Sequence, residues 1–419
     1  MLIAAIAVGL AGGADAAVAD PEDPFRRDRN HSVLERPRPE YAAPGVPAGG
    51  FRLFPEVEGA AVFNDNIFAA APEADAEQDV VYELRGRLDL ESQWSSHAIN
   101  IEAEVASREY SEFSDESTTD WMIGADGRLD ILRGYFATVS VSHSELHETR
   151  DQEPLASGIA SPVEYSATNA AFEIVRRFNR LMLSGRARYT EFDYEDADLV
   201  GGGVWDEDDR DRTVTEIGGR VEYALADDRS VFFALTHNTR DYRDARSAAV
   251  RRDSSGVEVL AGANFDLTHL VRGEVGIGYL DQSYDDPSLS SVSGLSSRFR
   301  VEWYVDPLVT VTLAGARAVE DASVLNAGGY LRDQVNLNVD YEWRRNVLAG
   351  LGAEYGRDDY NGIDRTDERQ AFTGTLRYLM NRRSIFEFEI ANAAQDSAGS
   401  ESGREYEINE LRLGVRLRR

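Results

Sequence analysis

Cysteine and lysine are both absent from this chain of 419 residues, so arginine supplies all 44 basic side chains. Without cysteine the protein forms no disulfide, binds no metal through thiolates and has no thiol nucleophile. Basic charge is also scarce beside acidic charge, because 75 aspartate and glutamate residues leave a net charge of −31 at pH 7. This balance argues against a nucleic-acid-binding protein, since contacts with phosphates require a basic surface.

Long apolar runs are missing as well. After the first twenty positions no run reaches the roughly 18 residues that a membrane-spanning helix requires. Residues 2–13 are apolar but too short to span a bilayer, and small residues fill most of positions 14–19, which is the pattern of a secretory signal peptide. We predict a signal peptide over residues 1–19, cleaved before Asp20; the alternative is a buried helix of a soluble domain. Export and the lack of cysteine together suit a bacterial envelope protein.

Residues 20–50 have a different composition. They contain six of the twelve prolines and many charged residues, with almost no apolar periodicity. A segment of this composition cannot bury a hydrophobic core, so we predict a disordered, Pro-rich periplasmic leader. Two interpretations remain open: the leader is a solvated connection, or it is a plug for the domain that follows or an arm for a partner.

From Phe51 to the end of the chain, apolar and polar residues alternate. The segment 79–91 shows this most clearly, since its even positions from Tyr82 to Leu90 are apolar or glycine and its odd positions from Glu83 to Glu91 are all charged. Successive side chains of a β-strand point to opposite faces, so the segment predicts a strand with one apolar and one charged face. The segments 254–267 and 331–344 repeat the pattern.

About 18 such segments follow one another along residues 51–419, which we predict to form one domain. Short connections such as 132–134 and 344–346 alternate with longer polar ones such as 149–162 and 195–210. We expect the strands to begin near residues 55, 79, 98, 120, 135, 163, 181, 212, 230, 255, 270, 295, 308, 330, 347, 368, 384 and 405.

Short turns at one end, longer loops at the other and an even number of strands are typical of an outer-membrane barrel. Closure into a barrel also satisfies every backbone hydrogen-bonding group within lipid. We therefore predict an all-β fold: a transmembrane antiparallel β-barrel of the outer-membrane type, with short periplasmic turns, longer extracellular loops and a periplasmic N-terminus.

Aromatic residues gather near both ends of the predicted strands, as expected for girdles at two membrane interfaces. The alternative is that strands are simply rich in aromatic residues. Near the short turns lie Trp94, Tyr135, Phe178, Tyr223, Phe265, Trp303, Trp343 and Phe386. Near the long loops lie Trp121, Tyr165, Tyr189, Tyr242, Tyr279, Tyr355 and Tyr406.

Charged residues on the polar parity would face the interior, which at this strand number is an aqueous channel. They are interpreted either as a field that selects a hydrophilic solute or simply as the polar wall that any wide barrel needs. The candidate lumen-lining residues are Glu83, Arg85, Arg87, Asp89, Glu102, Glu104, Arg108, Arg128, Arg186, Arg188, Arg220, Glu222, Glu274, Arg298, Arg300, Glu302, Arg332, Asp340 and Glu354. Aromatic residues that we place on the same parity, where they would stack on sugar rings or pack against loops, are Phe136, Phe172, Phe192, Tyr194, Tyr304 and Tyr378.

No catalytic constellation or cofactor site stands out. Ser142 and Ser144 flank His143, but in a strand they lie on the opposite face from it, which excludes a nucleophile–base pair. The acidic loop segment 206–211 offers carboxylates through which calcium would bridge to anionic lipid. It lacks the central glycine of an EF-hand loop, and solvated loop charge is the default interpretation. We predict no enzyme activity, no cofactor and no metal.

The end of the first predicted strand reads Val62-Phe63-Asn64-Asp65-Asn66-Ile67-Phe68, and an acidic loop leads to a second strand that begins Asp79-Val80-Val81. With these residues the chain resembles the putative β-barrel porin-2 family, and the resemblance in architecture covers residues 51–419. Asn64, Asp65 and Asn66 form the family-like motif. The resemblance implies an outer-membrane barrel associated with exopolysaccharide synthesis and export, and it carries over no catalytic residue.

We expect a channel in the outer membrane of a Gram-negative bacterium that passes a hydrophilic solute. The resemblance makes an exported polysaccharide the preferred cargo and adds periplasmic export components as candidate partners. General diffusion of small polar solutes, or a non-conducting surface scaffold or adhesin, are the alternatives. Outer-membrane lipid is an expected partner and nucleic acid is not, while the periodicity leaves the oligomeric state open.

Overall fold

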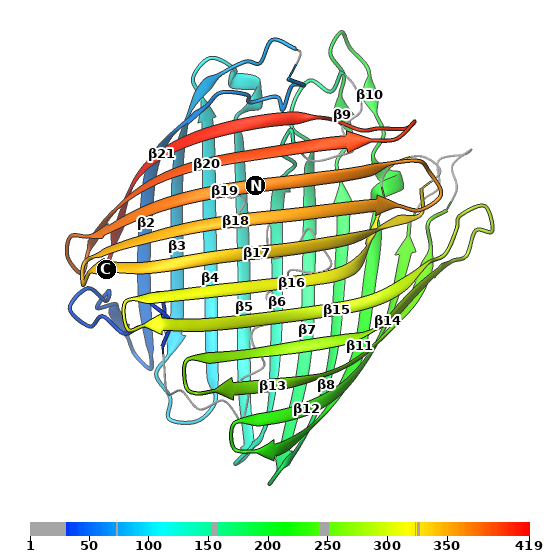
Figure 1. Cartoon of the computed structure of the whole chain (residues 1–419). Coiled ribbons are helices and arrows are strands. Elements are labelled where there is room, and N and C mark those ends of the chain that lie inside the picture. The colour runs from blue at the N-terminus through cyan, green and yellow to red at the C-terminus, as the bar shows by residue number, and fades with distance from the viewer. Residues whose placement is uncertain (1–30, 73, 152–157, 244–250, 323, 325–326) are drawn as a thin grey trace.

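In the computed structural model, which describes residues 31–72, 74–151, 158–243, 251–322, 324 and 327–419, one sheet closes into a barrel (Figure 1). Within these ranges eighteen antiparallel strands form the wall, and strands that follow one another in the chain are neighbours in the sheet. The first of them, β2 (Phe51–Asn64), also pairs with the last, β21 (Tyr406–Arg418), and this pairing closes the barrel. The predicted fold class and strand number are confirmed.

Every wall strand begins within four residues of its predicted start. Between β2 and β21 the wall consists of β3 (Asp79–Ser92), β4 (Ala98–Tyr110), β5 (Thr118–Leu132), β6 (Tyr135–His147), β7 (Glu164–Phe178), β8 (Leu181–Tyr194), β11 (Arg212–Ala226), β12 (Arg229–Tyr242), β13 (Ser254–Leu267), β14 (Val271–Tyr284), β15 (Val292–Asp306), β16 (Val309–Asp321), β17 (Gly329–Arg344), β18 (Val347–Tyr360), β19 (Thr366–Leu379) and β20 (Ser384–Ala398).

Short elements lie outside the wall. The strand β1 (Val46–Ala48) pairs with β2, and β9 (Ala197–Asp198) pairs with β10 (Val204–Trp205) in one loop. Two single-turn 3₁₀ helices, η1 (Ser114–Glu116) and η2 (Asp208–Arg210), lie in loops. Across the described ranges, no helix is long and apolar enough to cross a membrane.

Connections of two to five residues join the strands at one end of the barrel, here called the turn side. At the other end, the loop side, the connections contain five to seventeen residues. Gly134 has a φ of 71° in the two-residue turn after β5, a left-handed conformation that suits glycine in a tight hairpin. The described ends of the wall, at Phe51 and Arg418, both lie on the turn side.

The inner face of the sheet is identified by contacts that skip strands. Arg220 on β11 reaches Glu274 on β14 at 2.7 Å, although β12 and β13 lie between them in the sheet. Side chains converge in this way only on the concave face. On the opposite, outer face, apolar residues such as Leu84 and Leu351 are 60% and 67% exposed, as expected for a surface in contact with lipid.

Glycine lines the inner face where β13 and β14 pass close to opposing side chains. A Cβ atom added at Gly276 would lie 2.7 Å from Leu260 Cδ2, and one added at Gly262 would lie 2.5 Å from Phe232 Cζ. These distances are too short for a Cβ atom without movement of the neighbour. Part of the abundant glycine of this sequence therefore permits close approach of inner side chains.

The aromatic girdle differs between the two ends. On the turn side, Trp303 and Trp343 are exposed on the outer face, as predicted. On the loop side, Tyr189, Tyr279 and Tyr355 are also exposed and outward. The girdle prediction is wrong for Tyr165, Tyr242 and Tyr406, which lie on the inner parity of their strands and are buried.

Candidate functional site: the barrel interior

The inner wall carries every residue that the sequence predicted to line the lumen. Each of these residues has the same strand parity as inward residues such as Glu58 and Glu222, and it alternates with exposed apolar residues of the outer face. The alternation of polar and apolar residues places them there. Their contact with a passing solute stays a prediction.

Ion pairs between strands neutralise much of the wall around the closing seam. Arg85 on β3 lies 3.2 Å from Glu104 on β4, and Arg412 on β21 lies 3.1 Å from Glu83 on β3. Glu58 on β2 is buried and accepts hydrogen bonds from both Arg412 and Arg416. Paired charges of both signs keep an interior surface polar without leaving an isolated buried charge.

The wall between β8 and β15 is less balanced. Arg220 is held between Glu222 and Glu274 at 2.8 and 2.7 Å. Arg186 instead donates a hydrogen bond to the hydroxyl of Thr236 at 3.0 Å. Among the described residues, no carboxylate lies within 4.0 Å of Arg186 or Arg298. On β17, Asp340 likewise has no arginine within this distance, so inward residues of both signs lack an ion-pair partner among the described residues.

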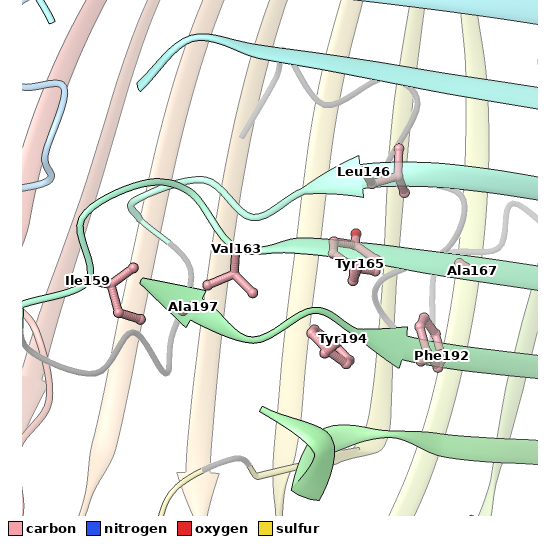
Figure 2. Close-up of a cluster of buried hydrophobic side chains, with 8 residues drawn as sticks. All are labelled: Leu146, Ile159, Val163, Tyr165, Ala167, Phe192, Tyr194 and Ala197. Carbon is pink, nitrogen blue, oxygen red and sulfur yellow. The ribbon is translucent and has the colours of Figure 1, made fainter. Parts of the chain in front are cut away.

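Inward side chains gather in a buried apolar cluster at the loop side of the barrel (Figure 2). Tyr165 on β7 and Tyr194 on β8 stack with ring centroids 5.1 Å apart, and both belong to a buried apolar cluster. Ile159 joins this cluster from the loop between β6 and β7, and that loop also forms a β-bridge from Ile159 to Leu199 of the next loop. Two of the long loops therefore fold together over one side of the opening.

Arg210 of η2 connects these loops through ion pairs and an aromatic contact. Its guanidinium donates to Glu148 Oε2 at 3.0 Å, lies 3.4 Å from Glu207 and covers the ring of Tyr194 at 4.0 Å from the centroid. Burial alone would lower its pKa, but the adjacent Glu148 carboxylate raises the pKa of Arg210 above its ordinary value. Arg210 therefore stays charged at any physiological pH and acts as a permanent link.

Arg150 links four loops at one point. It donates to both carboxylate oxygens of Glu116 at 2.8 and 2.6 Å and to the backbone oxygen of Ile159 at 3.3 Å. Its own backbone oxygen accepts a hydrogen bond from Arg404, in the loop before β21. Its guanidinium also faces the ring of Phe68, in the loop after β2. The loop side is thus a connected assembly rather than a set of independent hairpins.

The leader forms part of the turn side. Val33 is completely buried against Leu348, Leu379 and Ile385, which are inward residues of β18, β19 and β20. Its backbone N–H donates to Thr310 Oγ1 on β16 at 3.0 Å. The prediction of a disordered leader is therefore wrong for residues 31–50, because these long-range contacts order them. The predicted signal peptide and residues 20–30 lie outside the described part of the chain.

Charged contacts hold the leader against the inner rim. Glu342 on β17 lies 3.0 Å from Arg36 and 2.7 Å from Arg38. Further along, Glu40 accepts a hydrogen bond from Arg345 at 2.6 Å. A backbone hydrogen bond and this arginine lower the pKa of Glu40 below its ordinary value. The leader contacts strands from β16 to β2 at the turn-side end of the barrel and so occupies part of the opening at that end.

The predicted inner aromatics divide into two groups. The residues that lie on the inner face, as predicted, are Phe136, Phe192, Tyr194 and Tyr304. Arg128 covers the ring of Phe136, and Arg212 covers the ring of Phe192. The prediction is wrong for Phe172 and Tyr378, which point outward and are 44% and 43% exposed. In the sheet they pair with the outward residues Val139 and Val347. Sequence reasoning missed several tyrosines that lie on the inner parity at loop-side strand ends, namely Tyr110, Tyr284, Tyr330 and Tyr360.

The family-like motif is located at the closing seam. Asn64 donates to Glu410 Oε1 at 2.9 Å, and Asp65 accepts hydrogen bonds from the backbone and side chain of Asn409 at 2.7 and 2.9 Å. Asn66 is buried and donates to the backbone oxygens of Ala70 and Glu407, each at 2.9 Å. The motif therefore connects β2 and the loop after it to β21, which is a structural role.

Among the described residues, the side chains considered for metal binding or catalysis are one group of loop carboxylates and two histidines. The carboxylates of Asp196, Asp206 and Asp208 lie within 4.8 Å of one another, but all three residues are exposed loop acids, and we assign no metal site to them. His143 points outward and its Nδ1 lies 2.8 Å from the hydroxyl of Thr168. His237 also points outward, with its Nδ1 2.9 Å from the backbone oxygen of Gly256.

The closed wall, the charged interior and the outer apolar surface together describe a membrane barrel. The model of the family described as Putative beta-barrel porin 2 matches residues 38–419. The chain belongs to this family. As a member of the Putative beta-barrel porin 2 family, it is a porin-like barrel of the outer membrane, surrounded by membrane lipid. No curated protein matches it.

The solved structures to which this chain is similar are distant from it in sequence. The siderophore receptor PirA from Pseudomonas aeruginosa is 9% identical over 88% of this chain and 80% of that chain, with a TM-score of 0.50. The outer membrane protein opdK from the same species is 9% identical over 88% of this chain and 99% of that chain, with a TM-score of 0.43. A BenF-like porin from Pseudomonas fluorescens Pf-5 is 10% identical, with coverages of 88% and 99% and a TM-score of 0.47. At 9% identity the likeness to PirA concerns the fold alone.

Proposed function

We propose that this family member is a channel that passes a hydrophilic solute across the outer membrane of a Gram-negative bacterium, and that the solute is an exported polysaccharide. The observation that carries the channel is the charged inner wall. A barrel of about this strand number encloses an aqueous lumen. The inner face carries charges of both signs, and some of them, such as Arg298 and Asp340, have no ion-pair partner within 4.0 Å among the described residues.

The polysaccharide is proposed on the resemblance stated from the sequence and on the inner aromatic residues. Aromatic faces stack on sugar rings, and Phe136 and Tyr304 lie on the inner face. We propose that the protein has no catalytic activity. The outward orientation of His143 and His237 and the structural role of the seam motif support this. Periplasmic export components are proposed as partners.

Orientation is also part of the proposal. We infer that the turn side, with the N-terminus, faces the periplasm and that a signal peptide is removed during export. Short turns on the periplasmic side are the rule in barrels of this kind. The docked leader then occupies the periplasmic opening and the linked loops occupy the surface opening.

Planar-bilayer conductance tests the channel. Full-length mature protein is compared with a variant that lacks residues 20–45 and so keeps β1 and β2. Steady conductance from both forms supports an open channel, and conductance from the shortened form alone makes the leader a plug. If neither form conducts, in protein whose folding is verified by heat-shifted gel mobility, the channel is ruled out and the surface scaffold is favoured.

The same bilayer tests the solute. Oligosaccharides cut from an exported polysaccharide are added to each side, and the ion current is recorded. Current interruptions that lengthen with oligosaccharide length support a glycan path. Interruptions that are equal for neutral polyethylene glycol of the same size favour general diffusion of small polar solutes.

A further inference from the structure

Arginines on the outer surface are neutralised at the loop side. Arg243 lies 2.7 Å from Asp193, Arg317 lies 2.5 Å from Asp333, and Arg357 lies 3.0 Å from Asp359. The carboxylates occupy outward positions: Asp193 on β8, Asp333 on β17 beside the strand of Arg317, and Asp359 on β18, which also carries Arg357. Among the described residues, these outward arginines of the loop-side rim therefore have little unsatisfied positive charge to offer to a lipid.

The turn side contrasts with this arrangement. Arg133 lies in the turn after β5, Arg176 lies near the end of β7, and Arg180 lies in the turn before β8. All three are exposed, and among the described residues none has a carboxylate within 4.0 Å. We name these three residues the arginine patch.

The sheet brings the arginine patch together from two neighbouring hairpins. Arg176 pairs in register with Tyr135, the first residue of β6, and the backbone N–H of Arg177 donates to Gly134 in the adjacent turn at 2.7 Å. The guanidinium of Arg176 lies 4.5 Å from the ring centroid of Phe178 and 5.1 Å from that of Tyr135. The aromatic contacts hold this guanidinium at the rim without neutralising its charge.

The position of the patch relative to the apolar surface identifies its ligand. Leu132 and Phe178, immediately beside the arginines, are 67% and 43% exposed on the face that contacts lipid. Outward aromatic residues mark the depth of lipid headgroups. Exposed guanidinium groups at that depth face phosphates, which they bind with paired N–H donors. An acyl chain beside the headgroup would cover the exposed leucine.

We propose that Arg133, Arg176 and Arg180 form a binding site for the phosphate headgroup of an anionic phospholipid in the leaflet on the turn side. The inference concerns the outer surface and does not depend on what crosses the lumen. Because Arg243, Arg317 and Arg357 on the loop side are ion-paired within the protein, the patch also gives the barrel a preferred direction in an asymmetric membrane.

A second group of exposed arginines on the far side of the rim extends the same chemistry. Arg344 is the last residue of β17, and Arg382 and Arg383 lie in the turn between β19 and β20. None of the three has a carboxylate within 4.0 Å among the described residues. Their neighbour Arg345 differs, because Glu40 of the leader binds it at 2.6 Å. Anionic lipid is therefore expected at two places on the turn side.

The test measures lipid binding to the folded mature protein in uncharged detergent micelles by native mass spectrometry. The probes are short-chain phosphatidylglycerol, short-chain phosphatidylcholine and inorganic phosphate. The patch variant carries R133Q, R176Q and R180Q, and the matched variant R243Q, R317Q and R357Q removes the same charge from the loop side. Heat-shifted gel mobility verifies folding, and the single variant R180Q replaces the patch variant if the triple variant does not fold.

Wild-type protein is expected to bind phosphatidylglycerol more tightly than phosphatidylcholine, with a preference that weakens as salt is added. Each arginine removed from the patch should weaken phosphatidylglycerol binding about fivefold. The loop-side variant should bind as the wild type does. The second group of arginines keeps its own site in the patch variant, so the number of tightly bound lipids should fall rather than vanish.

Three results would overturn the proposal. Equal affinity for the two lipids in the wild type would remove the anionic preference. Unchanged phosphatidylglycerol binding in the patch variant would show that the arginines do not form the site. Inorganic phosphate binding as tightly as phosphatidylglycerol would reduce the site to a general anion site without a lipid.

Discussion

Arg38 on the leader donates a hydrogen bond to Glu342 on β17 at 2.7 Å, across 304 positions of sequence. The same carboxylate oxygen accepts a second hydrogen bond, from Arg36 at 3.0 Å. Glu342 is buried, so its charge depends on these two partners. The contact fixes the leader to the inner wall. Replacement of the Glu342 carboxylate by an amide tests whether it holds the leader in place.

Replacement of Glu342 by glutamine should release the leader. Loss of the charge weakens two charge-assisted hydrogen bonds, which we expect to cost about 2 kcal/mol of docking free energy. A glutamate-specific protease should then cleave after Glu35 and Glu40 in folded protein roughly thirtyfold faster. The release of the N-terminal fragment on a denaturing gel measures this rate.

Asp340→Asn is the matched control for this prediction. Asp340 lies on the same strand and the same face, and it makes no hydrogen bond or ion pair with the described leader residues. It should leave the cleavage rate at the wild-type value. Equal acceleration by both variants would mean that loss of wall charge, rather than release of the leader, controls cleavage.

Acid should loosen the leader through Glu40. Its pKa is lowered from 4.5 in the folded protein by a backbone hydrogen bond and by Arg345. A lowered folded-state pKa contributes stability that is present above the ordinary pKa and is lost as the pH falls through the lowered value. Docking should therefore be constant from pH 7 to about 5 and weaken below about 4.

A fluorophore on a single introduced cysteine, Ala42→Cys, reports this change, since the chain contains no other cysteine. The emission is recorded against pH in wild-type background and with Arg345→Gln. The glutamine variant should lose most of the acid-dependent step. An identical step in both proteins would assign the titration to another group.

Arg150→Gln should open the loop side. It leaves the buried carboxylate of Glu116 without its bidentate partner, which we expect to cost about 3 kcal/mol. Hydrogen exchange of residues 111–117 should accelerate, because their loop is tied to the others through this pair. Arg357→Gln breaks an ion pair whose side chains are both 45% exposed, so its effect should stay below about 1 kcal/mol. Comparable exchange in the two variants would argue against Arg150 as the link.

Gly276→Val should destabilise the barrel by overfilling the inner face. Its Cβ atom would lie 2.7 Å from Leu260, and the added methyl groups should cost about 3 kcal/mol. Gly59→Val on the outer face of β2 meets no atom within 4 Å and should change stability by less than about 0.5 kcal/mol. Urea midpoints of unfolding from micelles compare the two, and similar midpoints would contradict the close approach.

The wall was predictable because lipid and water impose opposite demands on the two faces. In the segment 82–91 every outward position is apolar or glycine and every inward position is charged, so the sequence shows which residues of the strand face inward. The prediction of the inward face fails at Phe172. Ala171 and Val175 lie on one face of the strand and Ile174 lies on the other, so both faces carry apolar residues there. Residue type alone could not place that side chain.

Strand ends and the leader were harder to predict for different reasons. Tyr165 and Tyr406 lie where the alternation stops, so an inward tyrosine beneath a loop looks the same as a girdle tyrosine. The order of the leader depends on contacts such as that of Val33 with Thr310, 277 positions away. Proline and charge content describe only the leader's own tendency to stay unfolded and contain no information on such a partner.

The pairing of β2 with β21 makes the order of assembly directional. Nine positions are in register along this seam, from Glu56–Arg418 to Asn64–Glu410, against fourteen between β2 and β3. Every other pairing in the wall joins strands that follow one another along the chain. The cylinder must therefore remain an open ribbon until the thirteen residues of β21 arrive, and its last-made strand is also the one that seals it.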